Sequence, residues 1–257
     1  GDHVSLLNLY CEEGGAAAGY IRAGSDAVGV DMDRRHLRYY PSMHAIDDAL
    51  SFVRDYVLTG LDEYDAIHAS PPCQAYTRGN AGKVTDWPRL IGPVRDLLQA
   101  TGKPYIIENV ADARPELVDP VTLCGCMFDL HTVDTDGITI HLQRPRLFET
   151  NFPLEAPRPC DHTDHEWVAG AHGGARRDKY EAKYVRKGGY VPKDKDVVQR
   201  LLGIEHPMTW GGLFESIPPA YTEWIGGQLR DDLDQQRQQR SDDAIAKLRS
   251  LLSEETA

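Results

Sequence analysis

The chain lacks the features of several protein classes. Its 257 residues include no apolar run of the roughly 18 residues that a membrane-spanning helix needs. The N-terminal residues show no basic region followed by a long apolar stretch, so we expect no secretory signal. Five cysteines without regular spacing do not make a disulfide framework and fit a reducing compartment. These absences predict a soluble, cytoplasmic protein.

Positive charge is also scarce. The chain has 28 Lys and Arg against 40 Asp and Glu, which gives a net charge of −12. Such a charge disfavours nucleic acid as a partner, because binding a polyanion needs positive potential. The charge is uneven, however, since residues 175–196 hold eight Lys or Arg and four Asp or Glu. The average therefore hides a basic segment.

Apolar patterning predicts alternating strands and helices in the first part of the chain. We expect strands at 3–10, 28–33, 64–69 and 104–110. The stretch 12–24 is expected to form a glycine-rich turn that opens a helix, and further helices are expected at 46–58 and 87–100. Strands alternating with helices predict an α/β fold with a mostly parallel sheet, whose carboxyl-terminal edge collects ligands.

The pattern weakens after Phe148. Residues 151–196 are rich in Pro, Gly, His and charge, and we expect loops there. Regular structure is expected again at 197–204 and 217–229, and a solvated helix at 230–252.

Polar residues follow the expected strands. Gly14 and Gly15 would let the backbone approach a ligand at a helix start. Asp31 ends the next strand, where an acid commonly binds ribose hydroxyls. The motif is not GxGxxG, so a dinucleotide is not specifically indicated, and a tight turn without ligand is the alternative.

The stretch SPPCQ places Cys73 behind two prolines, which stiffen the loop. Taken alone, a buried structural cysteine is the commoner interpretation. Glu108 follows PYII near the end of the strand at 104–110 and would face the same crevice; by itself it could equally be a capping residue. Together, the thiol and the carboxyl group make a nucleophile and proton-handling pair. Arg144 and Arg146 alternate on a predicted strand and so would point to one side, either toward phosphates or a carboxylate or at an exposed sheet edge.

Six sequence elements occur in the order found in the DNA cytosine-C5 methyltransferases. LNLYCEEGGAAAGYIRAG resembles the first motif, usually DLFCGAGG followed by GxxxAG, and VGVDMD resembles the second. ASPPCQ is similar to the catalytic PCQ loop, IIENV to the ENV motif, QRPRLFE to the QxRxR element, and SIPPAYTEWIG to the final motif. The elements cover about residues 4–148 and 200–229. The chain thus resembles a compact member of this family, of the kind found in phages and prophages.

The resemblance implies a Rossmann-like S-adenosylmethionine-dependent methyltransferase fold with a mixed, mostly parallel sheet and a very small target-recognition segment. It divides the chain into a catalytic and cofactor-binding domain at 2–150, a short basic DNA-recognition segment at 151–196, a return to the catalytic domain at 197–229 and a polar C-terminal helix at 230–257. It also implies a bacterial cell or a phage-infected host.

The resemblance further implies a reaction in which Cys73 adds to C6 of a cytosine flipped out of DNA. Glu108 would hold N3 and the exocyclic amine, and Arg144 or Arg146 would contact O2 and support Glu108. For S-adenosylmethionine, Asp31 would bind the ribose and Asp48 the adenine amine. The implied cofactor-binding residues are Tyr10, Cys11, Glu12, Gly14, Gly15, Asp31, Met32, Asp48, Pro71, Ser216 and Ile217.

The sequence departs from the family pattern beside the expected cofactor. Asn8 stands where the family has an acid, Glu12 where it has a glycine, and Glu215 and Ser216 where it shows Gly-Asn and a small residue. Glu12 could repel the cofactor's carboxylate or bind its ammonium group. It raises the possibility of a modified S-adenosyl donor, such as a decarboxylated one. Two rival hypotheses are a catalytically silent DNA-binding relative and an enzyme acting on a free pyrimidine nucleotide.

The DNA contacts are expected in the basic segment. The implied DNA-binding residues are Gln74, Arg176, Arg177, Lys183, Arg186 and Lys187. The cysteine and histidine spacings CxC and CxHxxH are not the usual CxxC, so no metal is expected. The expected oligomeric state is a monomer or weak dimer.

Overall fold

The computed structural model describes residues 3–59, 63–77, 87–171 and 191–254. A seven-stranded sheet of order β3-β2-β1-β4-β5-β9-β6 forms its centre. The first five strands pair in parallel, and β9 runs antiparallel to both β5 and β6. The strands are β1 (Val4–Leu9), β2 (Ser25–Asp31), β3 (His44–Ile46), β4 (Ala66–Ala69), β5 (Tyr105–Val110), β6 (Val121–Leu123) and β9 (Arg146–Thr150), with β7 (His131–Val133) and β8 (Thr139–His141) as a separate pair.

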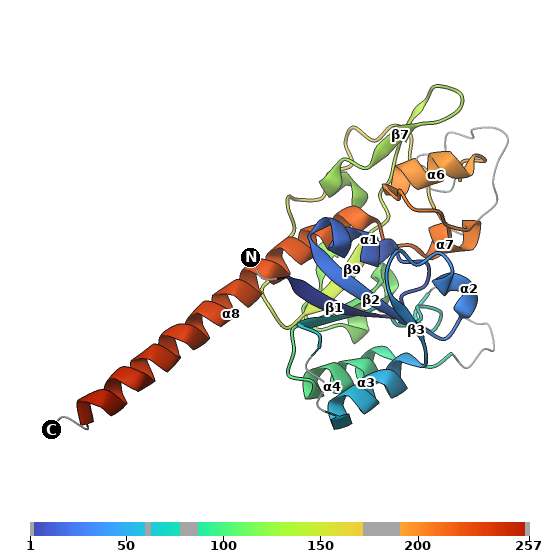
Figure 1. Ribbon diagram of the computed structural model, residues 1–257. Coiled ribbons are helices and arrows are strands. Elements are labelled where there is room, and N and C mark those ends of the chain that lie inside the picture. The colour runs from blue at the N-terminus through green and yellow to red at the C-terminus, as the bar shows by residue number, and fades with distance from the viewer. Residues whose placement is uncertain (1–2, 60–62, 78–86, 172–190, 255–257) are drawn as a thin grey trace.

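Helices cover both faces of this sheet. Figure 1 shows α3 and α4 on one face, and α1 with the first part of α8 on the other. The helices are α1 (Gly15–Arg22), α2 (Arg34–Leu37), α3 (Ala49–Thr59), α4 (Ile91–Ala100), α6 (Lys195–Leu202), α7 (Trp210–Glu215) and α8 (Pro219–Glu254), with the 3-10 helices η2 (Ala111–Glu116) and η3 (Gly125–Phe128).

The strand sequences divide their apolar side chains between the two faces. Along β1, Leu6 packs toward α1 and α8, while Leu7 packs toward α3 and α4. Successive side chains of a strand point to opposite faces, so both faces of a central strand must be apolar when helices cover both. Gly19 of α1 allows the close approach of α8, because a Cβ there would lie 2.1 Å from the carbonyl oxygen of Pro219.

A third apolar cluster lies beside the sheet. It joins Ile140 and Leu142 to the buried faces of α6 and α7. Asp194 caps α6, and Thr209 caps α7 with its side chain accepting from the backbone N–H of Gly212. These caps fix where the two helices begin.

The predicted mostly parallel α/β sheet is confirmed, whereas several element boundaries were wrong. The helix expected from residue 46 begins at Ala49, because Ile46 still pairs with Asp31 in β3. Residues 219–229 of the expected segment 217–229 and all of 230–252 belong to one helix, α8, whose second part projects from the domain in Figure 1. Within the described residues, none of the helices combines the length and the apolarity required to span a bilayer.

Candidate active site

A cavity of about 400 Å³ opens where β1, β2, β4 and β5 end. Parallel strands present their carboxyl ends at the same sheet edge, so residues distant in sequence meet there. All eleven residues that the motif resemblance assigns to a cofactor line this cavity. Cys73, Gln74, Glu108 and Arg146 line it as well.

The turn after β1 separates its two glutamates. Glu12 lines the cavity and has a positive φ of 46°, and its backbone N–H donates to Asp31 at 3.0 Å. Glu13 is buried, and its carboxylate accepts bonds from the backbone N–H and the hydroxyl of Thr209, at 2.7 and 2.5 Å. Gly14 follows at φ 88°, a conformation that L side chains rarely adopt. Of these two neighbouring acids, Glu12 therefore faces the cavity, and Glu13 binds Thr209, the residue that caps α7.

Glu12 lies in an acidic environment. Burial, and then the charges of Glu215, Asp31 and Glu108, raise the pKa of Glu12 to about 8, while Arg144 opposes them. The carboxyl group is therefore largely protonated at neutral pH when no cation lies beside it. The two acids singled out in the sequence, Glu12 and Glu215, do face the same cavity.

The Cys73 loop is tied to the end of the neighbouring strand. The side-chain amide of buried Asn109 donates to the carbonyl oxygen of Pro71 at 2.9 Å. The carbonyl oxygen of Cys73 accepts from the backbone N–H of Tyr76 and from Thr77. Burial raises the pKa of the Cys73 thiol, Glu215 and Glu108 act in the same direction, and Arg146 lowers it. The thiol is half-buried and held on a fixed loop.

Glu108 forms an ion pair inside the cavity. Its carboxylate lies 3.3 Å from the Nε of Arg146, and both side chains are largely buried. Burial raises the pKa of Glu108, whereas Arg146 and a hydrogen bond from Ser70 lower it. Glu108 can therefore hold a proton for a ligand more readily than an exposed glutamate can.

The two arginines of the predicted strand do not point the same way. Arg144 lies ahead of β9 with a φ of 37°, so strand alternation does not apply to it. Its guanidinium donates to the carbonyl oxygens of Phe214 at 2.6 Å and Ser216 at 2.9 Å, and also to that of Ala171. Burial, and then Arg146, lower the pKa of Arg144 to about 9, so it stays charged at neutral pH. Arg144 holds the end of α7, and Arg146 alone of the pair lines the cavity.

A series of buried hydrogen bonds connects Glu108 to the interior of the protein. The hydroxyl of Tyr20 lies 2.8 Å from Nδ1 of His68, and Nε2 of His68 lies 2.9 Å from the hydroxyl of Ser70. Ser70 in turn hydrogen-bonds to Glu108. Burial lowers the pKa of His68 to about 3, so the ring is neutral. The sequence did not predict these hydrogen bonds, although His68 inside the apolar run DAIHAS indicated a buried polar residue.

Other residues also distinguish the observed site from the expected one. Asp47, Trp87 and Asn109 line the cavity without having been selected from the sequence. The expected DNA-binding residues of the basic segment lie outside the described residues; they are Arg176, Arg177, Lys183, Arg186 and Lys187.

Comparison with known proteins supports the fold. No family model matches the chain, and a sequence search of curated proteins finds no match. A protein encoded within an E. coli prophage, described as a DNA modification methyltransferase, matches with a TM-score of 0.54 at 14% identity over 90% of this chain and 99% of its own. The S. pombe Dnmt2 methyltransferase gives 0.56 at 14% over the same shares, and the Entamoeba histolytica methyltransferase EhMeth gives 0.51 at 13% over 91% and 99%. The chain therefore has the methyltransferase fold that its motifs predicted.

Proposed function

We propose that the chain is a DNA cytosine C5 methyltransferase that uses S-adenosylmethionine. One observation carries the proposal: Cys73, Glu108 and Arg146 converge on a cavity that also holds the acids Glu12, Asp31 and Glu215 and lies beside a glycine turn. A thiol, a carboxyl group with a raised pKa and a guanidinium are groups that suit nucleophilic addition to a pyrimidine ring.

The residues present fit a cationic adenosyl cofactor. Glu12, Asp31 and Glu215 line the cavity, and their carboxylates would attract the positive charge of a sulfonium and an ammonium group. Bound there, S-adenosylmethionine would supply an electrophilic methyl group. Asp31 would bind the ribose, Asp48 the adenine amine, and Tyr10 and Met32 would flank the adenosine.

The reaction steps follow from the chemistry of the side chains. Cys73 would lose its thiol proton, and its sulfur would form a bond to C6 of cytosine as the C5–C6 double bond breaks, which makes C5 electron-rich. C5 would then take the methyl group from the sulfonium, whose sulfur would leave as a neutral thioether. Glu108 would hold N3 and the exocyclic amine, and Arg146 would orient Glu108 and contact O2. Removal of the C5 proton would re-form the ring double bond and expel Cys73. Arg144 would act on this chemistry only by holding Ser216 and the end of α7.

Duplex DNA hides C6 within the base stack, so the target cytosine would have to flip into the cavity. The basic sequence of the recognition segment supports a phosphate contact, with Arg176, Arg177, Lys183, Arg186 and Lys187 as its cations. Gln74 lines the cavity beside Cys73 and would lie next to the flipped base.

The test incubates duplex DNA with the protein and S-adenosylmethionine, and then measures the nucleosides by mass spectrometry. We expect 5-methylcytosine with the wild-type protein and none with Cys73→Ser. A duplex containing 5-fluorocytosine should form a covalent adduct through Cys73. Fluorine replaces the C5 proton whose removal would expel Cys73, and a base cannot remove fluorine in the same way. Saturable binding of DNA with neither a modified base nor an adduct would favour a silent relative. Activity on dCMP but not on DNA would overturn the choice of substrate.

A modified S-adenosyl donor is the second candidate. The observation that favours it is the pairing of Glu12 with Glu215 at one cavity wall, which suits a donor with more positive charge. Decarboxylated S-adenosylmethionine should then give faster transfer than the ordinary cofactor, and the mass added to cytosine identifies the group. Full turnover with S-adenosylmethionine to 5-methylcytosine rejects this candidate.

A further inference from the structure

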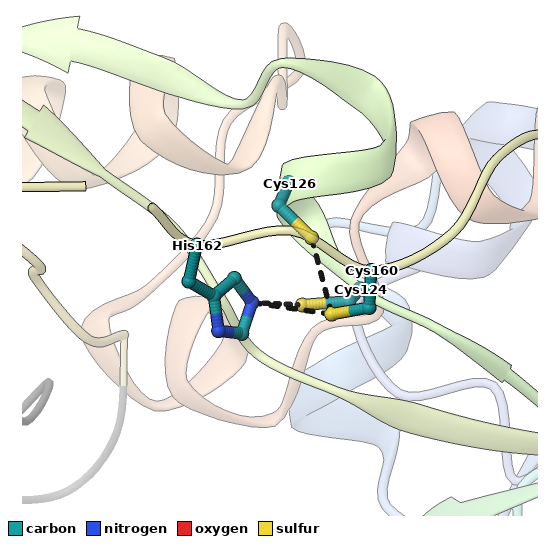
Figure 2. A group of neighbouring side chains, drawn as sticks. All are labelled: Cys124, Cys126, Cys160 and His162. Atoms are coloured by element: carbon teal, nitrogen blue, oxygen red, sulfur yellow. Dashed lines mark hydrogen bonds between the residues drawn. The ribbon is translucent and has the colours of Figure 1, made fainter. Parts of the chain in front are cut away.

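Four potential metal ligands meet at one point, away from the cavity. Cys124 precedes η3, Cys126 lies within it, and Cys160 and His162 come from the segment that follows β9 (Figure 2). Their ligand atoms all lie within 4.8 Å of one another. Two pairs of residues separated by about 33 positions of sequence thus form one cluster.

The distances suit a single tetrahedral ion. Nε2 of His162 lies 3.3 Å from both the Cys124 and the Cys160 sulfur atoms, and the Cys126 and Cys160 sulfur atoms are 3.3 Å apart. Ligands bound to zinc at 2.0–2.3 Å in a tetrahedron lie about 3.5–3.8 Å from one another. These separations bracket the tetrahedral values, so a small rearrangement of the side chains would place one ion among all four.

The chemistry of the group favours a cation over four uncharged partners. A thiol is a weak donor and a weak acceptor, so contacts among three thiols and an imidazole contribute little by themselves. The Cys124 thiol also lies 2.9 Å from the carbonyl oxygen of Gln143, a contact that its thiolate would give up on binding a metal. Three thiolates and one divalent ion leave a net charge of −1, and the guanidinium of Arg158 lies close by, donating to the carbonyl oxygen of Cys126 at 2.7 Å.

We propose that Cys124, Cys126, Cys160 and His162 bind one Zn²⁺ ion as a structural site. Thiolate and imidazole ligands select zinc among the common divalent ions, and four protein ligands leave no position open for a substrate. The ion joins η3, at the edge of the central sheet, to the segment of residues 151–171.

The position of the cluster gives this site a structural purpose. Gln143, whose carbonyl oxygen accepts from the backbone N–H of Gly125 at 2.6 Å, lies directly before Arg144. The segment of residues 151–171 has little regular structure of its own. An ion bound by Cys124 and Cys126 on one side and by Cys160 and His162 on the other would fix this segment against the sheet. Structural metals stabilise small regions that cannot build a sufficient core.

The first measurement is the zinc content of the full-length protein, purified without chelators from cells grown with added zinc. We expect about one zinc per chain. Replacing zinc with Co²⁺ should produce thiolate-to-cobalt charge-transfer absorption and the strong visible bands of a tetrahedral site. Absence of both zinc and a thiolate–cobalt spectrum in the wild-type protein overturns the proposal, as does an intact mass that reveals a Cys126–Cys160 disulfide.

Matched variants identify the ligands. Cys160→Ser and His162→Asn should lower the zinc content at least tenfold. His165→Asn is the control for His162, because its ring stacks on His162 with centroids 5.4 Å apart but is not one of the four ligands. Cys73→Ser is the control for the cysteine change. Retention of zinc by both ligand variants, or equal loss in the controls, rejects the assignment even if one variant folds poorly, since the cobalt spectrum of the wild-type protein is an independent readout.

Discussion

The side chains of Glu12 and Glu13 are adjacent in sequence and act on different parts of the molecule. Glu12 faces the cavity among Glu215, Asp31 and Glu108, while Glu13 is buried against Thr209 at the start of α7. A positive φ at Glu12 and a left-handed Gly14 produce this separation. The functional meaning of the sequence CEEGG therefore depends on which glutamate is changed.

Changing Glu12 to Gln should alter the pH dependence of cofactor binding. A bound cation stabilises ionised Glu12, so binding must release the proton that the free protein holds below its pKa of about 8. Affinity of the wild-type protein for S-adenosylmethionine should thus weaken as the pH falls below 8, by up to about tenfold per pH unit. Calorimetry in buffers of different ionisation enthalpy measures the released proton.

The Glu12→Gln protein is the reference for that experiment, because the ligand's own ammonium group titrates equally with both proteins. The difference between the two pH profiles belongs to Glu12. Identical profiles would mean that Glu12 does not contact the cofactor's cation.

Changing Glu13 to Gln should destabilise the fold. The variant weakens two part-buried hydrogen bonds that the side chain of Glu13 accepts from Thr209, at a cost of about 1–3 kcal/mol in the free energy of unfolding. Urea denaturation measures the change. Glu12→Gln is the matched control and should keep its stability, since the Glu12 carboxyl is already largely protonated at neutral pH. Equal stability of the two variants would contradict the different tasks of these residues.

Arg146 and Arg144 should respond differently to replacement by Lys. Arg146→Lys should lower turnover by about 10²–10³-fold with little loss of stability, because a preorganised donor beside Glu108 is changed. Arg144→Lys should instead lower the free energy of unfolding, since one ammonium cannot reach the carbonyl oxygens of both Phe214 and Ser216 in the same geometry. Methyl-transfer kinetics and urea midpoints separate the two effects. Normal turnover in Arg146→Lys would remove Arg146 from the reaction.

His68 should make the protein sensitive to acid. Its pKa is about 3 in the folded state and about 6.5 in an unfolded chain, so the unfolded state binds an extra proton between these values. The stability associated with neutral His68 is complete above pH 6.5 and declines as the pH falls toward 3, by up to about 1.4 kcal/mol per pH unit. Urea unfolding of the wild-type and His68→Gln proteins across this range measures the difference. A variant with the same acid profile as the wild type would contradict the low pKa.

Much of the sheet and of the cavity could be predicted because they depend on local sequence. The apolar runs that became β1, β4 and β5 are bounded by polar residues, and parallel pairing brings those residues to one edge. Cys73 and Glu108 belong to short contiguous motifs, PPCQ and ENV, which can be recognised in the sequence alone.

Features that depend on long-range contacts could not be read from the chain. Glu13 binds the start of α7 and Arg144 binds its end, across about 200 and 70 positions of sequence. No local sequence pattern predicts these contacts. The same applies to the cluster of Cys124, Cys126, Cys160 and His162. Its CxC spacing does not predict a metal site, and only the fold brings η3 and the segment after β9 into contact.

The packing of α1 against α8 also has a consequence for biosynthesis. Tyr20 is fully buried in a cluster that includes Tyr221 and Leu233, so it is covered only after those later residues have been synthesised. At about 5–20 residues per second, the 200 residues between Tyr20 and Tyr221 take about 10–40 seconds to synthesise. During that interval the nascent chain presents one apolar face of its sheet without its final partner, which is the kind of surface that ribosome-associated chaperones hold.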